Sequence, residues 1–232
     1  MSFDKTLAQE IARHYSNDQG EERGLVNSFV QVCHFLYDHP DRLSLRLKGN
    51  ILSVQTDQAI HLLARRYFAG FRRSDFPILA GTVPDEMVSI VMMEAFGYTK
   101  EESERIKVDH QYAMVAENCV GTLLERYLDS VLRPHGWHWC CGNFVKAIDF
   151  VRQDHDGQWL ALQIKNRDNS ENSSSSAIRS GTNIQKWFRS YSRTGNTNWH
   201  NLPPLMQGFQ VSEQGFISFV RSYLHVEKMK RV

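Results

Sequence analysis

The segment NFVKAIDFVRQDHDGQWLALQIK, residues 143–165, carries the pattern that decides the fold. Apolar and polar residues alternate along 143–153 and again along 158–165, which is typical of strands with one buried face. The tetrapeptide DHDG at 154–157 joins the two runs and has the composition of a tight turn. The segment therefore predicts an antiparallel hairpin.

Three polar side chains of this hairpin are expected to converge. Side chains alternate faces along a strand, so Gln163 and Lys165 share a face on the second strand, and Asp149 lies on the first. A carboxylate in an apolar run is costly to bury unless it is paired or binds a cation. One hypothesis accounts for both charges: Asp149 holds a divalent metal, and Lys165 orients or activates a water near a phosphate.

A long stretch with helical periodicity precedes the hairpin, at residues 111–132. Pro134 and Gly136 are expected to end this helix. Two glutamates of the same stretch, Glu117 and Glu125, are candidates to add a carboxylate to the metal site. The apolar stripe of the predicted helix consists of Val120, Leu123, Leu124, Tyr127, Leu128 and Val131.

Residues 1–110 are predicted to be mostly helical, because apolar residues recur there at three- and four-residue steps. Pro84, which two acids follow, predicts a helix start, and Thr99 with Glu102 has the spacing of a capping box. We expect this region to act in dimerisation or in wrapping DNA. Residues 111–232 are expected to form an α/β core that includes a DNA-reading segment.

The segment after Lys165 is polar and basic. The whole chain has a formal net charge of only +1. Residues 165–193 hold six basic and two acidic residues, a local net charge of +4. A local surplus on a nearly neutral chain favours a confined anion site over a nonspecific basic coat. A polar loop through Ser176 is expected there, followed by a helical stretch at 184–190.

The residue types of this segment fit contacts with DNA. Arginine pairs with guanine in two-point contacts and asparagine with adenine, whereas Ser, Thr and Lys commonly hold phosphates. Lys186 and Arg189, three residues apart on the expected helix, would follow one backbone strand. The predicted DNA-binding residues are Asn166, Arg167, Asn169, Ser170, Asn172, Ser173, Arg179, Thr182, Asn183, Lys186 and Arg189.

Asp149, thirteen intervening residues and then Gln163-Ile164-Lys165 resemble the PD-(D/E)XK nuclease signature. Ile148 stands where that signature usually has proline, and Gln163 replaces its second acid. A glutamine can ligate Mg²⁺ through its carbonyl oxygen, but it adds no charge. The spacing of Gly121 and Glu125 resembles the helix that leads into the core of resolvases and restriction enzymes of this superfamily, where such a glutamate lines the site. The resemblance favours Glu125 over Glu117.

The continuous run at 164–189 resembles type II restriction endonucleases of the SinI/AvaII kind, which cut the double-stranded sequence GGWCC. The resemblance implies a restriction-endonuclease-like α/β fold, with a small mixed β-sheet flanked by helices. It also implies Mg²⁺-dependent hydrolysis of phosphodiesters by a homodimer, with a cognate cytosine methyltransferase acting on the same site. The implied catalytic residues are Asp149, Gln163, Lys165 and Glu125, and the implied metal ligands are Asp149, Gln163 and Glu125, with Glu117 as the alternative.

Two other functions stay open at this point. One is a repair or junction nuclease of the same superfamily. The other is a non-catalytic DNA-binding protein, for which Gln163 is the best evidence because degenerate nucleases lose a ligand. Retention of both Asp149 and Lys165 argues against it.

Other classes of protein find little support in the sequence. The chain of 232 residues has no apolar run of the roughly 20 residues that cross a bilayer, and no secretory leader, so a cytoplasmic location is expected. The four cysteines are too few for a disulfide scaffold. His135, His138, Cys140 and Cys141 have a spacing that fits no common zinc site.

Overall fold

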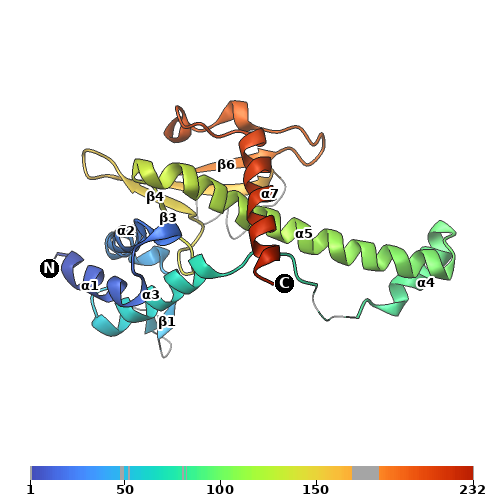
Figure 1. The fold of residues 1–232 in the computed structure, drawn as a ribbon, viewed down its shortest axis with the longest axis horizontal. Helices are drawn as coiled ribbons and strands as arrows, with labels where there is room; N and C mark the ends of the chain where they lie inside the picture. Colours follow the sequence, from blue (N-terminus) through green and yellow to red (C-terminus); the bar gives the residue numbers. More distant parts are fainter. Residues whose placement is uncertain are drawn as a thin grey trace.

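The computed structural model describes residues 2–47, 50–51, 53–79, 81, 83–168 and 183–231. Its central element is a four-stranded mixed sheet with the order β3-β4-β5-β6 (Figure 1). Its strands are β3 (His138–Trp139), β4 (Phe150–Gln153), β5 (Trp159–Arg167) and β6 (Ile184–Ser190). The first three strands pair antiparallel, whereas β5 and β6 are parallel. The predicted α/β class with a small mixed sheet is confirmed.

Helices surround this sheet. The α-helices are α1 (Lys5–Tyr15), α2 (Leu25–Asp38), α3 (Asp57–Arg72), α4 (Glu86–Phe96), α5 (Lys100–Leu132) and α7 (Glu213–Met229). Short 3-10 turns are η1 (Gly20–Glu22), η2 (Pro40–Arg42), η3 (Arg133–His135), η4 (Trp199–Asn201) and η5 (Pro204–Met206), and β1 (Arg46–Leu47) pairs with β2 (Asn50–Ile51). Helix α2 contacts β3 and β4, α1 and α3 pack on α2, and α7 crosses α5 (Figure 1).

The predicted hairpin is present as β4 and β5, with Val151 opposite Ala161. The Asp154 carboxylate accepts hydrogen bonds from backbone N–H groups within the turn, and Gly157 has a φ of 78°. The first strand is shorter than the alternation suggested, because residues 143–149 are not a strand. Asn143 and Ala147 both have positive φ, which breaks the extended backbone.

The helix predicted at 184–190 is wrong, because these residues form β6. Parallel pairing with β5 places Gln163 beside Lys186 and Ile164 beside Trp187, which is buried. Side chains alternate in a strand, so Lys186 and Arg189 lie on opposite faces. The shared helical face expected for them is therefore wrong as well.

The long helix is confirmed but begins earlier than expected. Helix α5 starts at Lys100, directly after the capping box of Thr99 and Glu102, and its 33 residues run unbroken through positions 110 and 111. Its end at Leu132 agrees with the predicted end. Within the described residues, no helix has both the length and the apolar character needed to cross a membrane.

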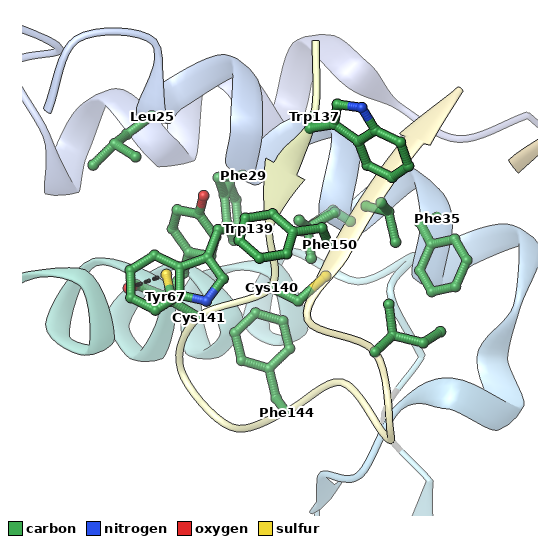
Figure 2. Packing of buried hydrophobic residues seen from close by; sticks show 14 of the residues in the cluster. Leu25, Phe29, Phe35, Tyr67, Trp137, Trp139, Cys140, Cys141, Phe144 and Phe150 are labelled. Carbon is green, nitrogen blue, oxygen red and sulfur yellow. Dashed lines mark hydrogen bonds between the residues drawn. The ribbon is translucent and has the colours of Figure 1, made fainter. Parts of the chain in front are cut away.

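The core lies between the helices α2 and α3 and the β3–β4 connection (Figure 2). Trp137, Phe144 and Phe150 are fully buried there, and the Cys141 thiol donates to the backbone carbonyl of Tyr67. Both adjacent cysteines are thus packing residues. Across the part of the chain that the structure describes, no three His, Cys, Asp or Glu side chains gather as a metal site.

Candidate active site

Two carboxylates from different elements, Glu125 of α5 and Asp149, line one cavity of about 400 Å³. Asp149 directly precedes β4, and Glu125 lies two turns before the end of α5. The cavity is otherwise lined by Arg66, Ala69, Gly70, Arg73, Thr122, Trp139, Cys140, Cys141, Gly142, Asn143, Val145 and Ile148. It therefore combines residues of the N-terminal helices with residues of the sheet.

The backbone of Asp149 is fixed between two strands. Its N–H donates to the Leu162 carbonyl over 2.8 Å, and its carbonyl accepts from the N–H of Cys140 over 2.8 Å. Its side-chain Oδ2 accepts from the N–H of Ile164 over 2.6 Å. These contacts hold the carboxylate at the edge of the hairpin with little freedom to turn.

Glu125 is held by one hydrogen bond, from the Trp139 indole N–H to Oε2 over 2.9 Å. Burial raises the pKa of its carboxyl, and the neighbouring charge of Asp149 raises it further, whereas Trp139 and Lys165 oppose the rise. Burial also raises the pKa of Asp149, against the Ile164 N–H and Lys165. The Lys165 ammonium therefore acts electrostatically on both carboxyls.

Gln163 and Lys165 lie on β5 beside these carboxyls. Gln163 is only 2% exposed. Extending the β4–β5 pairing by one step beyond Phe150 and Leu162 brings Gln163 opposite Asp149. Lys165 follows on the same face of the strand and is half-buried. Neither Gln163 nor Lys165 is among the residues that line the cavity, but the Lys165 charge acts on both carboxyls and the strand register places Gln163 beside Asp149.

Glu117 is placed differently. It lies two helical turns before Glu125, roughly 12 Å along the axis. Its side chain is 60% exposed and lies 3.8 Å from the Arg167 guanidinium. It is absent from the residues that line the cavity. Of the two candidate glutamates, only Glu125 lies in the cavity with Asp149.

The predicted DNA-binding residues fall into two groups in the described chain. Asn183 and Arg167 are exposed. Arg189 donates to Asn166 Oδ1 over 2.9 Å and to Glu213 of α7 over 2.6 Å, so its guanidinium is held within the protein. Lys186 is half-buried on β6. Outside the described residues lie Asn169, Ser170, Asn172, Ser173, Arg179 and Thr182.

Sequence reasoning missed the contribution of α3 and its C-cap, whose arginines Arg66 and Arg73 line the cavity. Arg66 lies within the helix, whereas Arg73 follows its last residue and pairs with Asp75 over 3.2 Å. A signal was present in the sequence RRYFAGFRR at 65–73, where four arginines flank Gly70. A cluster of cations beside two carboxylates gives the cavity both charges needed to hold a metal and a phosphate.

A contact between two glycines holds α3 against the cavity. A Cβ on Gly70 would lie 2.6 Å from the backbone nitrogen of Gly142, closer than real Cβ contacts allow. Gly142 itself has a φ of +98°, and its Cβ would lie 2.8 Å from the Arg66 carbonyl oxygen. Only glycine fits at either position. The helix therefore lies directly on the loop that leads to Asp149.

The chain is similar to known proteins along almost its whole length. A family model described as SinI restriction endonuclease matches residues 8–226. The type II restriction enzyme Eco47I of Escherichia coli is 43% identical over 219 residues, 94% of this chain and 94% of that protein. The type II restriction enzyme SinI of Salmonella infantis is 41% identical over 219 residues, again 94% of each chain.

Proposed function

Because the chain belongs to the SinI restriction endonuclease family, we propose that the cavity around Glu125 and Asp149 is where it cuts double-stranded DNA. The protein is a type II restriction endonuclease, a site-specific deoxyribonuclease. The proposal adds Mg²⁺ as the metal and GGWCC as the target. A cognate methyltransferase would modify the same sequence in the host.

One observation carries the assignment of the active site. Two half-buried carboxyls with raised pKa share a cavity with each other and lie beside Lys165 and the buried amide of Gln163. Buried like charges destabilise a fold unless a ligand compensates them. Such an arrangement of perturbed carboxyls in a cavity supports a functional role.

The donor set fits a hard divalent cation. Asp149 and Glu125 supply carboxylate oxygens, and Gln163 supplies an amide carbonyl, the ligand types that Mg²⁺ prefers. A bound cation would offset both the burial of Glu125 and the repulsion from Asp149, which together raise the pKa of Glu125. When bound, the metal would acidify a water and offset charge that develops on the phosphate. Water and phosphate oxygens would fill the remaining coordination positions of the metal.

Chain residues would carry the other parts of the reaction. The Lys165 ammonium has three N–H donors, which suits it to orient the attacking water and the scissile phosphate. The Ile164 N–H keeps Asp149 turned toward the cavity. Arg66 of α3 and Arg73 at its C-cap would neutralise DNA phosphates at the rim of the cavity. These roles correspond to a PD-(D/E)XK core in which Gln163 takes the place of the second acid.

The two glutamates of α5 provide a matched comparison. Glu125→Gln keeps an acceptor for the Trp139 N–H but removes the charge, so DNA cleavage should fall by roughly a hundredfold or more. Glu117→Gln should cut at the rate of the unmodified protein, because Glu117 is exposed outside the cavity. Single-turnover cleavage with excess enzyme gives both rates. Equal effects of the two substitutions would contradict the assignment of Glu125.

The raised pKa values also predict a link between pH, stability and metal binding. In the folded, metal-free protein, Glu125 and Asp149 have higher pKa values than in the unfolded chain, so the folded state binds more protons. The free energy of unfolding of the metal-free protein should therefore fall as the pH rises from the ordinary carboxyl pKa through the raised pKa. Mg²⁺ must displace those protons, so its affinity should increase with pH across the same window. Calorimetry in two buffers of different ionisation enthalpy should detect proton release. Binding heats that do not depend on the buffer would refute this linkage.

The function is tested by incubating the purified protein with unmethylated plasmid DNA, with Mg²⁺ or with EDTA, and sequencing the fragment ends. The proposal expects discrete Mg²⁺-dependent fragments that all end within GGWCC. Discrete ends at another sequence would leave the activity in place and refute the target. No cleavage together with a mobility shift would identify a DNA-binding protein and make Gln163 the mark of an inactive site.

A further inference from the structure

A second cavity, of about 980 Å³, lies beside the crossing of α5 and α7 (Figure 1). It is called the α7 cavity below and is lined, among others, by Phe71, Asp129, Arg133, His138, Phe219 and Tyr223. Of the described residues, none lines both this cavity and the cavity of Glu125 and Asp149. The α7 cavity is therefore a separate place in the fold, which the proposed cleavage reaction does not use.

His138 brings an unused hydrogen-bonding atom to this cavity. The residue is only 7% exposed, and its Nδ1 lies 3.1 Å from the Ser28 hydroxyl. Its other ring nitrogen, Nε2, has no hydrogen-bond partner in the part of the chain that the structure describes. Burial, and next the charge of Arg133, lower the pKa of His138 to about 4, so the imidazole is neutral and Nε2 can donate or accept according to its tautomer. A buried polar atom of this kind needs a partner from whatever occupies the cavity.

The charged side chains of the wall are already compensated within the protein. Three ion pairs account for the inner charges: Asp129 with Arg133, Arg126 with Asp75, and Glu227 with Lys230. At the rim, the exposed Glu21 and Arg23 carry opposite charges. A charged ligand would lose its hydration here for little net attraction, so the wall favours an uncharged ligand.

Aromatic rings form much of the apolar wall. Phe219 and Tyr223 of α7 are stacked, with ring centroids 6.0 Å apart. The Arg133 guanidinium lies 5.1 Å from the centroid of the Phe71 ring. Planar aromatic ligands pack well against such rings. The volume lies near the upper end of the roughly 300–1,000 Å³ typical of small-molecule sites, so a single ring would leave much of it empty.

We propose that the α7 cavity binds an uncharged heteroaromatic molecule of at least nucleoside size. Its ring would pack against Phe219 and Tyr223, and a donor or acceptor on its buried edge would bond to Nε2 of His138. Nucleosides are suitable probes, because their bases are planar and uncharged and carry donors and acceptors on their edges. A base within DNA has the same ring chemistry but brings phosphates with it, so nucleoside 5′-monophosphates distinguish the two sources.

Isothermal titration calorimetry of the full chain in EDTA tests the site without any cleavage of DNA. The probes are adenosine, guanosine, cytidine and thymidine. At least one of them should bind in a ratio of one per chain, with a Kd below about 1 mM. Its 5′-monophosphate should bind no tighter, because the inner cations of the wall are already paired.

Two substitutions on α7 locate the binding. Ser222 is exposed and lines the cavity, so Ser222→Trp should fill the space without disturbing the core and should abolish binding. Ser218→Trp is the matched control, because Ser218 is exposed one turn earlier and does not line the cavity. This variant should bind like the unmodified protein.

A third substitution tests the role of His138. Asparagine at this position keeps a polar atom near the place of Nδ1 for Ser28 and removes Nε2. His138→Asn should therefore weaken binding roughly tenfold, the effect of one lost hydrogen bond.

Failure of all four nucleosides to bind would overturn the proposal. So would a Ser222→Trp variant that binds like the unmodified protein, since the nucleoside would then lie elsewhere. A monophosphate that binds much tighter than its nucleoside would identify an anion site or a DNA contact instead. A protein that cuts DNA but binds none of the probes would keep the proposed function and lose only this site.

Discussion

Asp149→Asn is expected to reduce the rate of DNA cleavage by roughly a thousandfold, about 4 kcal/mol of transition-state stabilisation. Asparagine has nearly the shape of aspartate and keeps an oxygen acceptor for the Ile164 N–H, so the hairpin should fold unchanged. What is lost is the negative charge that would hold the metal. The variant should therefore bind Mg²⁺ more weakly and still bind target DNA.

The control for this substitution is Asp156→Asn in the hairpin turn. The Asp156 side chain is 72% exposed and lies outside the cavity. Its replacement should leave cleavage within a factor of two or so, since exposed charges contribute little. A fully active Asp149→Asn variant would show that the metal is held elsewhere. If the Asp149→Asn variant does not fold, Asp149→Ala serves as the second substitution. A folded Asp149→Ala variant should show the same loss of cleavage.

Lys165→Met is expected to give a loss of cleavage of similar size, again roughly a thousandfold, by a different route. Methionine keeps the unbranched apolar stem and removes the ammonium that would orient the water and the phosphate. Because the Lys165 charge also lowers the pKa of Glu125 and Asp149, its removal should raise the pKa of both carboxyls further. Metal binding should then require a higher pH. At that pH the metal site should still become fully occupied.

The contrast between the two variants is the informative result. Asp149→Asn should impair metal binding at every pH, whereas Lys165→Met should bind metal at high pH and still not cut. Lys228→Met on the exposed part of α7 controls for the loss of a lysine and should cut normally. Cleavage by Lys165→Met within a few-fold of the unmodified rate would remove Lys165 from the mechanism.

Much of the site was predictable because it depends on local patterns. Alternation along residues 158–165 and the turn at 154–157 predicted the hairpin that brings Asp149 to Gln163 and Lys165. The helix that carries Glu125 followed from its apolar stripe and its breakers. The choice between Glu125 and Glu117 came from resemblance, and the structure shows its physical basis: one glutamate reaches the Trp139 indole and the other reaches solvent.

Other parts depend on partners distant in the chain. Residues 184–190 carry aromatic and β-branched residues that suit either element over so short a run, and pairing with β5 decides for a strand. The role of α3 depends on contact between Gly70 and Gly142, which are 72 positions apart and have no local signal for each other. The helix EMVSIVMMEAF of α4 is apolar on most of its surface, a composition typical of a buried helix. In the structure, most of its large apolar side chains are exposed.

The most direct test of the metal site is a crystal structure with Mn²⁺ in place of Mg²⁺, in which anomalous scattering locates the ion. The proposal predicts an anomalous peak about 2.1 Å from carboxylate oxygens of Asp149 and Glu125, with the Gln163 amide oxygen in its coordination sphere. A peak at Glu117 and Arg167, or among the residues 135–141, would contradict it. So would a crystal saturated with Mn²⁺ that has no peak in the cavity between α3, α5 and the hairpin.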